Sequence, residues 1–337
     1  MARVMRTARA LWVTGPCLSE LRSEELAEPG PDEVLVRTRF SAVSRGTERL
    51  VLRGGVPADQ RERMRAPYQV GDFPWPVKYG YLSVGTVEQG PRDLVGRDVF
   101  CLHPHQTEYV VPAREVTPVP DGVPARRAVL AGAVETVVNA LWDVPPLLGD
   151  RVCVVGAGMV GGAAARLLAG VPGVEVTLVD VDPDRAATAE ALGVGFALPP
   201  DAPAEQDLVL HASATPEGLE LALGLLATGG VVTELSWYGD RVVPLALGGD
   251  FHSRRLTLRS TQVGTVSPSA RPRWDHAARR ALALALLRDP AYDALLTGTT
   301  AFEDLPGLMA QVARGDPGIC HTIAYRREDE DVQPDRA

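Results

Sequence analysis

A glycine-rich turn between a predicted strand and a predicted helix places the strongest constraint on the fold. The stretch VCVVGAGMVGG carries Gly156, Gly158 and Gly161 as G-x-G-x-x-G, directly after a β-branched run and directly before the helical stretch AAARLLAG. The first glycine permits a tight turn, the second lets the backbone approach a pyrophosphate, and the third allows close helix packing. Free N–H groups at the helix start would bind the anion. The stretch therefore predicts a Rossmann βαβ unit with a dinucleotide site.

A carboxylate at the end of the next strand supports this interpretation. Asp180 ends the run VTLVD, about 20 residues after Gly161, where a ribose-binding acid is expected. Its carboxylate oxygens would accept hydrogen bonds from ribose hydroxyls, and their negative charge would repel a 2′-phosphate. We therefore expect NAD(H), with NADP(H) disfavoured. Arg185 leaves some room for a phosphate, although such a residue more often covers the adenine or lies in solvent. Met159 and Val160, at the helix start, complete the expected cofactor-binding set in this half of the chain.

The pattern along the chain predicts two domains and an α/β fold class. Short strands broken by Gly and Pro fill the first 120 or so residues and indicate a twisted β domain. From Asp150 onward, continuous β-branched runs alternate with amphipathic helices, which predicts a parallel sheet covered on both faces. A final strand, HTIAYR, is expected to return to the first domain. The expected division is residues 1–125 with 293–326 as the β-rich domain, 126–292 as the Rossmann domain and 327–337 as a disordered tail.

Composition excludes several classes of function. The formal net charge of the 337 residues is −9, which disfavours binding to a phosphate backbone. The four cysteines lie far apart and never as Cys-x-x-Cys, which argues against a disulfide framework and a thiolate zinc site. No apolar run is long enough for a signal peptide or a membrane span. We expect a cytoplasmic protein that binds a small-molecule substrate, with neither nucleic acid nor membrane as a partner.

The order of these features resembles the medium-chain dehydrogenase/reductase superfamily over residues of about 8–325. A β domain precedes the glycine fingerprint, which is followed by VDxDxxRxxxAxxLG and by LELALGLLATGGVVTEL. The resemblance implies an NAD(P)-dependent oxidoreductase with a GroES-like catalytic domain, a Rossmann domain and the substrate in the cleft between them. Arg45 stands where members of the family often contact the cofactor pyrophosphate. The segments SxGTExL and GYxSVG are similar to the hydroxyethyl bacteriochlorophyllide dehydrogenases, and WYGDRVVPLALGGDFHSRRL resembles a subunit-pairing region, which implies a homodimer.

The chain departs from the family at every position that would bind catalytic zinc. Ser44 stands where the first cysteine would fall, and Tyr81 and Leu82 stand in place of the His-Glu pair. The third ligand position falls on Ala131 or Gly132. Zinc prefers thiolate, imidazole or carboxylate ligands in a tetrahedral array, which these residues do not supply. The four-cysteine lobe that holds a structural zinc in the family is also missing. We therefore expect no metal site and a zinc-independent branch of the family.

Without a metal, protein side chains have to stabilise the substrate oxygen. Lys78 is the only lysine in the sequence, and it lies three residues before Tyr81, whose phenol should point into the space of the missing metal. A nearby ammonium would lower the pKa of the phenol, so the two residues form a candidate Tyr–Lys acid/base pair. The alternative is a tyrosine that fills the vacated space and a lysine in solvent.

A second candidate segment holds Cys101, His103 and His105. Period-2 spacing would put the three side chains on one face of a strand, but Pro104 favours a loop. In the family this segment borders the substrate, so His103 or His105 is a candidate proton shuttle. A replacement metal site is the alternative, and it lacks further carboxylate or thiolate ligands nearby.

A third candidate is Glu135, near the start of the helix that leads to the fingerprint, with Asn139 one turn further on the same face. A buried unpaired carboxylate is costly, so Glu135 is either an exposed acid at the helix start or a residue of the site, and we favour the site. The hydroxyls of Ser44 and Thr47 are expected to join the proton relay. The remaining histidines lack partners at useful spacing and are interpreted as structural: His211, His252, His276 and His321.

These observations favour a zinc-independent oxidoreductase that interconverts a secondary alcohol and a carbonyl on a small or medium-sized metabolite. One alternative is an enoyl reductase, in which hydride goes to an activated alkene and the site holds an oxyanion. A second alternative is a regulator that binds NAD(H) and no longer turns over. The sequence leaves these alternatives open.

Overall fold

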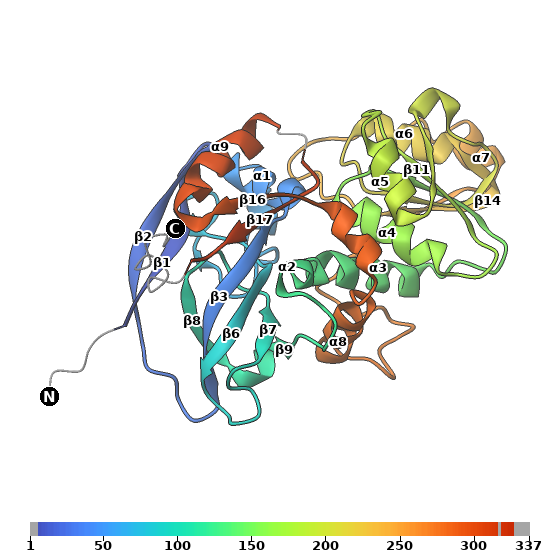
Figure 1. Ribbon diagram of the computed structural model, residues 1–337. Coiled ribbons are helices and arrows are strands. Elements are labelled where there is room, and N and C mark those ends of the chain that lie inside the picture. Colours follow the sequence, from blue (N-terminus) through green and yellow to red (C-terminus); the bar gives the residue numbers. More distant parts are fainter. Residues whose placement is uncertain (1–5, 316–317, 327–337) are drawn as a thin grey trace, which may run out of the picture. The chain divides into compact units, whose positions relative to one another are not determined.

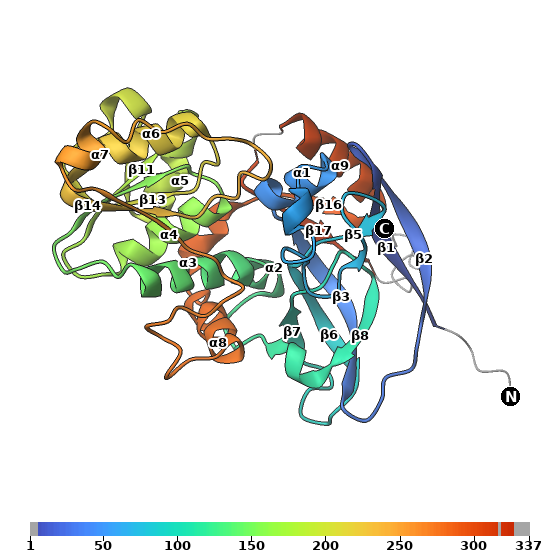
Figure 2. The ribbon, with the colours of Figure 1, turned by 180° about the vertical axis from the view of Figure 1, so that it is seen from behind.

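The computed structural model describes residues 6–315 and 318–326, which Figures 1 and 2 show from opposite sides. The chain divides into two compact units, one formed by residues up to Val129 and from Thr297 onward, the other by Leu130–Leu296. Both boundaries between the two units lie four residues after the domain boundaries expected from the sequence. The predicted tail, residues 327–337, lies outside the described residues.

The first unit is built mainly from β-strands, in agreement with the expected GroES-like domain. One sheet has four strands in the order β2-β1-β5-β4, and a larger sheet has the order β16-β17-β3-β6-β7-β9, with β8 also paired to β3. The strands are β1 (Arg6–Gly15), β2 (Leu18–Leu26), β3 (Glu33–Val43), β4 (Val70–Gly71), β5 (Val77–Lys78), β6 (Ser83–Gln89), β7 (Asp98–Cys101), β8 (Glu108–Pro112), β9 (Thr117–Pro118), β16 (Leu296–Ala301) and β17 (Cys320–Ala324).

Alternating side chains explain the core of this unit. Val34 and Val36 on β3 are fully buried and pack with Val99 on β7 and Val111 on β8. Along each strand, the residue next to a buried valine points to the opposite face of the sheet, because side chains in a strand alternate with a period of two. The helical segments of the unit are α1 (Arg45–Leu52), α2 (Ala125–Ala128), α9 (Leu305–Arg314) and the short 3₁₀ turns η1 (Ala58–Gln60), η2 (Ala113–Glu115) and η5 (Phe302–Asp304).

The second unit contains a six-stranded parallel sheet, which confirms the predicted Rossmann domain. Its order is β12-β11-β10-β13-β14-β15, so the direction of winding reverses between β10 and β13. In sheets of this kind the ligand lies outside the carboxyl ends of the strands at that reversal. The strands are β10 (Arg151–Val155), β11 (Glu175–Val179), β12 (Gly195–Ala197), β13 (Gln206–His211), β14 (Leu226–Glu234) and β15 (Thr257–Ser260).

Helices lie on both faces of this sheet (Figures 1 and 2). They are α3 (Ala131–Asp143), α4 (Met159–Ala169), α5 (Arg185–Leu192), α6 (Pro216–Gly224), α7 (Asp250–Ser253) and α8 (His276–Leu286), with 3₁₀ turns η3 (Pro199–Asp201) and η4 (Pro290–Leu295). The side chains of Thr215 and Asp275 accept backbone N–H groups at the starts of α6 and α8, which fixes where these helices begin. None of the helices in the described part of the chain has the length and apolar character that crossing a bilayer requires.

Candidate active site

The glycine-rich turn joins β10 to α4, and packing requires two of its glycines. Gly156 has a φ of 106° and lies on the backbone of Ser213, whose nitrogen would be 2.7 Å from an added Cβ. A Cβ on Gly161 would lie 1.8 Å from the Gly156 carbonyl oxygen, so no side chain fits there. A Cβ on Gly158 would meet nothing within 4 Å. This open space lies directly before α4, where Met159 and Val160 form the first turn, and it fits a pyrophosphate at a helix N-terminus.

Asp180 is held in place beside this turn. Its Oδ2 accepts the Ala157 N–H at 2.6 Å, and its Oδ1 accepts the Asp182 N–H at 3.0 Å. The carboxylate therefore lies directly after β11, where a ribose-binding acid is expected. Arg185, the residue that left room for a 2′-phosphate, forms an ion pair with Asp182 at 3.3 Å. Turn, helix and carboxylate together fit a dinucleotide whose ribose hydroxyls approach Asp180.

A polar cluster that the sequence analysis missed lies at the carboxyl ends of β13 and β14. The Nδ1 of His211 lies 2.8 Å from the Glu234 carboxylate, and its Nε2 lies 2.6 Å from the Ser213 hydroxyl. The hydroxyl of Tyr238 donates to Glu234 at 3.1 Å. The expectation that His211 lacks partners is therefore wrong. A signal was present, because His211 and Glu234 are the last residues of adjacent parallel strands, and such residues meet at the ligand-binding edge of the sheet.

In the first unit, two of the positions that correspond to zinc ligands in the family touch each other. Tyr81 donates a hydrogen bond from its hydroxyl to Ser44 Oγ at 2.5 Å, and the hydroxyl of Thr47 is a second partner of the phenol. Burial raises the pKa of Tyr81 to about 12, although the hydrogen bonds with Ser44 and Thr47 act to lower it. The phenol therefore stays protonated at neutral pH. Its chemistry is that of a proton donor.

The structure corrects the proposed Tyr–Lys pair. Lys78 is buried, with 6% of its surface exposed, and its ammonium donates to Glu24 at 2.5 Å and to Gln106 at 2.8 Å. It is therefore neither in solvent nor engaged with Tyr81. The pKa of the phenol moves upward through burial, opposite to the shift expected from a nearby ammonium. The ion pair between Lys78 and Glu24 joins β5 to β2 and is structural.

The two histidines of the Cys101–His105 segment have different surroundings. The segment leaves β7 at Cys101 and continues as a loop, as Pro104 indicated. His103 stacks on Tyr109 with ring centroids 3.8 Å apart, and burial lowers its pKa to about 3. A histidine that stays neutral across physiological pH is a poor proton shuttle. The ring of His103 therefore acts as packing, and of the two candidates only His105 is joined to other polar side chains of the site.

His105 contacts Glu48, a residue that the sequence analysis did not single out. The Nε2 of His105 lies 2.9 Å from Glu48 Oε2, and Glu48 Oε1 accepts the Ser44 N–H at 2.7 Å. Both side chains are buried, with exposed fractions of 0% and 2%. Glu48 therefore links the histidine to the residue whose hydroxyl contacts Tyr81. Glu48 lies four residues after Ser44, one position beyond the usual spacing of a capping acid, so the common helix-start pattern did not mark it.

Glu135 is buried and paired within the second unit. Its Oε1 accepts a hydrogen bond from Arg279 Nε at 3.0 Å, and Arg279 also donates to Asn139. Burial raises the pKa of Glu135, and the charge of Arg279 opposes that shift. The prediction that Glu135 and Asn139 share a helix face is confirmed, and the picture of Glu135 as an exposed acid is wrong. A catalytic role for Glu135 stays a prediction, as does a pyrophosphate contact for Arg45 at the start of α1.

The donor set at the two adjoining zinc-ligand positions does not fit zinc. Ser44 and Tyr81 offer a hydroxyl and a protonated phenol, and neither is a good ligand for this ion. Residues 6–315 and 318–326 contain no group of three or more His, Cys, Asp or Glu side chains arranged to hold a metal ion.

Known proteins similar to this chain include several dehydrogenases. No family model matches the chain. D-guloside 3-dehydrogenase from Escherichia coli is 24% identical over 326 residues, covering 88% of this chain and 91% of that protein. The 2-desacetyl-2-hydroxyethyl bacteriochlorophyllide A dehydrogenase of Cereibacter sphaeroides is 26% identical over 263 residues, 71% of this chain and 76% of that protein. The resemblance to the latter, expected from two short segments, is confirmed.

Solved structures share the whole fold. L-idonate 5-dehydrogenase from Escherichia coli superposes with a TM-score of 0.75 at 13% identity, covering 95% of this chain and 99% of that one. Acetophenone reductase from Geotrichum candidum in complex with NAD gives 0.74 at 19% identity, over 96% and 98% of the two chains. The chain is therefore similar, in sequence and in fold, to medium-chain dehydrogenases/reductases. The relatives are dehydrogenases and a neighbour in structure holds NAD, so the comparisons support an NAD(P)-dependent oxidoreductase.

Proposed function

We propose that the protein interconverts a secondary alcohol and a carbonyl on a small or medium-sized metabolite, with NAD(H) as cofactor and without zinc. The observation that carries the proposal is the hydrogen bond between Tyr81 and Ser44 at two positions that hold the metal in zinc-dependent members. A protonated phenol there can stabilise a developing oxyanion, the task that zinc performs in those members.

The bound cofactor would supply or accept the hydride, and side chains of the chain would handle the proton. In carbonyl reduction the Tyr81 hydroxyl donates its proton to the substrate oxygen, which is consistent with a pKa raised to about 12. The Ser44 hydroxyl, which accepts from Tyr81, holds the phenol in position and can return the proton. Thr47 supplies a second hydrogen bond to the phenol. In alcohol oxidation the same groups act in reverse.

The preference for NAD(H) over NADP(H) rests on Asp180. Because two backbone N–H groups already hold its carboxylate, the negative charge lies beside the glycine turn before any ligand arrives. A 2′-phosphate at that place would be repelled, and the Asp182 ion pair draws Arg185 away from compensating for it. Replacing Asp180 with Gly should narrow the difference between the dissociation constants of NADH and NADPH, measured by fluorescence titration. An unchanged ratio would contradict this assignment.

The test of the proposed reaction combines metal analysis with a substrate panel. Purified protein is assayed with secondary alcohols, beginning with sugar-derived ones, and with enones, while elemental analysis reports the metal content. We expect alcohol-dependent reduction of NAD without stoichiometric metal. The Tyr81→Phe variant should lose about 100-fold in kcat. Tyr79 supplies the control, because its ring packs edge-on against Tyr81 with centroids 6.0 Å apart. The Tyr79→Phe variant should keep its activity. One essential metal ion per subunit would overturn the proposal, activity with enones alone would favour an enoyl reductase, and tight NADH binding without turnover would favour a regulator.

We also propose that the protein is a cytoplasmic homodimer. In the second unit, β15 is the last strand of the sheet, and no described strand pairs with its outer edge. Unpaired edges of this kind can join across a two-fold axis. The exposed side chains of Val242 and Leu247, in the segment before α7, add apolar surface in the same unit. Light scattering should give twice the mass of the chain, and a monomer at micromolar concentration would contradict the proposal.

A further inference from the structure

Four buried or half-buried polar side chains of the first unit form a hydrogen-bonded chain that starts beside the Ser44–Tyr81 pair. They are Glu48, His105, Ser41 and Tyr325, which we call the buried relay. His105 Nδ1 lies 2.7 Å from Ser41 Oγ, and Ser41 Oγ lies 2.9 Å from the Tyr325 hydroxyl. With the contact of 2.9 Å between His105 Nε2 and Glu48, every neighbouring pair in the relay is within hydrogen-bond distance.

The partners fix the direction of each hydrogen bond. A carboxylate can only accept, so His105 carries its hydrogen on Nε2 and donates it to Glu48. Its Nδ1 is then an acceptor and receives the hydroxyl hydrogen of Ser41, which in turn receives that of Tyr325. All donors therefore point from Tyr325 towards Glu48. In this state a proton that enters at Tyr325 can be passed inward to Glu48 by successive hops. When every hydrogen bond in the relay has reversed its direction, a proton can be passed outward from Glu48 to Tyr325.

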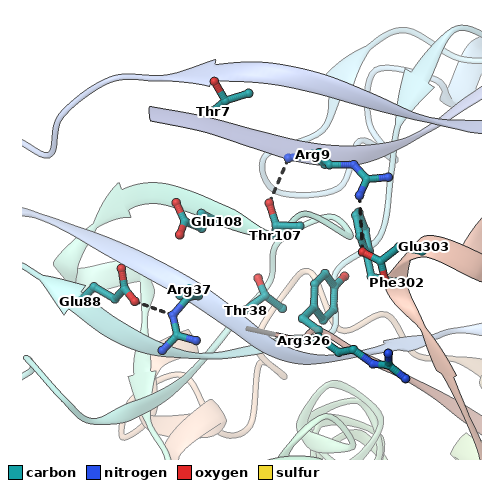
Figure 3. Close-up of a pocket in the computed structure, with 11 residues that line it drawn as sticks. Thr7, Arg9, Arg37, Thr38, Glu88, Thr107, Glu108, Phe302, Glu303 and Arg326 are labelled. Carbon is teal, nitrogen blue, oxygen red and sulfur yellow. Dashed lines mark hydrogen bonds and ion pairs between the residues drawn. The ribbon is translucent and has the colours of Figure 1, made fainter. Parts of the chain in front are cut away.

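The outer end of the relay opens on a cavity of about 520 Å³ in the first unit. Tyr325 is one of its lining residues and stacks on Phe302, with ring centroids 4.7 Å apart. Figure 3 shows Arg9, Glu303 and Arg326 around the same cavity, so its walls are polar and charged. Water enters polar cavities of this size readily. Tyr325 can therefore exchange its hydroxyl proton with solvent, whereas Ser41, Glu48 and His105 are at most 2% exposed.

We propose that the buried relay carries the proton of the reaction between the Ser44–Tyr81 pair and solvent in this cavity. The inference deepens the proposed function and rests on it. In carbonyl reduction, hydride adds to the carbon, the oxygen takes the Tyr81 proton, and the relay replaces that proton from solvent. In alcohol oxidation, the C–H electron pair leaves as hydride to the cofactor and the O–H proton leaves through the relay. The balance is one alcohol plus NAD⁺ giving one carbonyl, NADH and a released proton.

One step of this path is not a direct side-chain contact. Glu48 meets the Ser44 backbone N–H at 2.7 Å, not the Ser44 hydroxyl. The path crosses this gap through one water molecule or through a rotation of the Ser44 side chain, which brings the hydroxyl towards the carboxylate. Glu48 and His105 are thus the groups that hold the travelling proton, while Ser41 and Tyr325 pass it on.

The test uses two variants that break the relay without touching the Ser44–Tyr81 pair. Ser41→Ala removes its middle, and Tyr325→Phe removes its outer hydroxyl while keeping the ring on Phe302. The same sheet offers a matched control, because Ser83 and Tyr109 form another buried hydroxyl pair at 3.2 Å. Ser83→Ala and Tyr109→Phe remove one hydroxyl each and interrupt nothing in the relay.

We expect kcat to fall about tenfold or more in both relay variants, within the range for a lost acid–base route, with a larger solvent deuterium isotope effect and recovery on addition of imidazole buffer. The control variants should keep the wild-type kcat. Wild-type kcat in Ser41→Ala and Tyr325→Phe, or equal losses in all four variants, would overturn the relay.

A second measurement is independent of turnover. In the resting protein, exchange of the His105 Nε2 proton with water, followed by nitrogen-15 NMR, should be slower in both relay variants and unchanged in both controls. If the wild type turns over no alcohol, the proposed function fails and this exchange rate alone decides the relay. Equal exchange rates in the wild type and in Ser41→Ala would refute it.

Discussion

The ion pair inside the second unit allows a quantitative test of the structure. Arg279 is 1% exposed and Glu135 is 2% exposed, and the guanidinium also donates to the Val263 carbonyl and to Asn139. Replacing Arg279 with Met keeps much of the volume and leaves the Glu135 carboxylate buried without its counter-charge. The adjacent Arg280 offers a comparison, because it is also buried, its Nε has no hydrogen-bond partner, and its charge acts on Glu135 less than that of Arg279 does.

The expected loss follows from the cost of an unpaired buried charge. Removing one partner of such a pair typically costs about 3–5 kcal/mol. For a unit of this size, 1 kcal/mol shifts the melting temperature by about 2–4 °C, so Arg279→Met should lower it by roughly 6–20 °C. Arg280→Met should cost about 1 kcal/mol, the usual effect of a single substitution.

The loss should depend on pH. Burial already raises the pKa of Glu135, and Arg279 opposes that shift. Without Arg279 the pKa rises further, so the folded state of the variant holds its proton at a pH where the unfolded chain has released it. Such a group loses stability as pH rises from its unfolded pKa towards its folded one. The gap in melting temperature between wild type and Arg279→Met should therefore be small near pH 4.5 and wide at pH 8.

Differential scanning calorimetry at several pH values measures this gap. Adding Glu135→Gln to Arg279→Met should recover part of the stability, because a neutral amide replaces the unpaired charge. The reasoning is refuted if Arg279→Met is no less stable than Arg280→Met, or if the gap is the same at acidic and alkaline pH.

Three further predictions follow from single residues. Gly161→Ala should abolish NADH binding in a fluorescence titration, because its Cβ would lie 1.8 Å from a carbonyl oxygen, while Gly224→Ala, whose Cβ meets nothing within 4 Å, should bind normally. The ring signals of His103 should not titrate between pH 5 and 8 in NMR spectra, because its pKa is about 3, and a midpoint near neutrality would contradict the buried stack. Lys78→Met should lower the melting temperature by several degrees, because Glu24 loses its cationic partner and keeps only the Trp12 indole N–H, and should leave kcat unchanged. A large loss of kcat would restore the catalytic interpretation of Lys78.

The fold was predictable because its signals are local. The glycine turn, the β-branched runs and the alternation of helices define the Rossmann unit within short windows of sequence. The stretch from Ala125 to Asp143 is an exception, since its apolar residues recur at helical spacing throughout and yet it forms two helices, α2 and α3, that meet near Leu130. Periodicity continues across the junction, so no local signal marks it.

The candidate site was predictable only in part, because its contacts join residues far apart in sequence. Ser44 and Tyr81 were found through positions shared with a family, and the structure brings them together. The contact of His105 with Glu48 spans 57 residues, and no local pattern announces it. The interpretation of Lys78 as a partner of Tyr81 was wrong for a related reason. Its actual partner, Glu24, lies on another strand 54 residues away in the sequence, where no local pattern indicates the contact.

The burial of Lys78 has a practical consequence. It is the only side-chain amine in the sequence, and its nitrogen is held inside the small sheet of the first unit by Glu24 and Gln106. An acylating reagent can modify it only while that sheet is open. The rate of acylation at Lys78 therefore reports how often the sheet opens transiently. Mass spectrometry can measure this rate without a label being introduced.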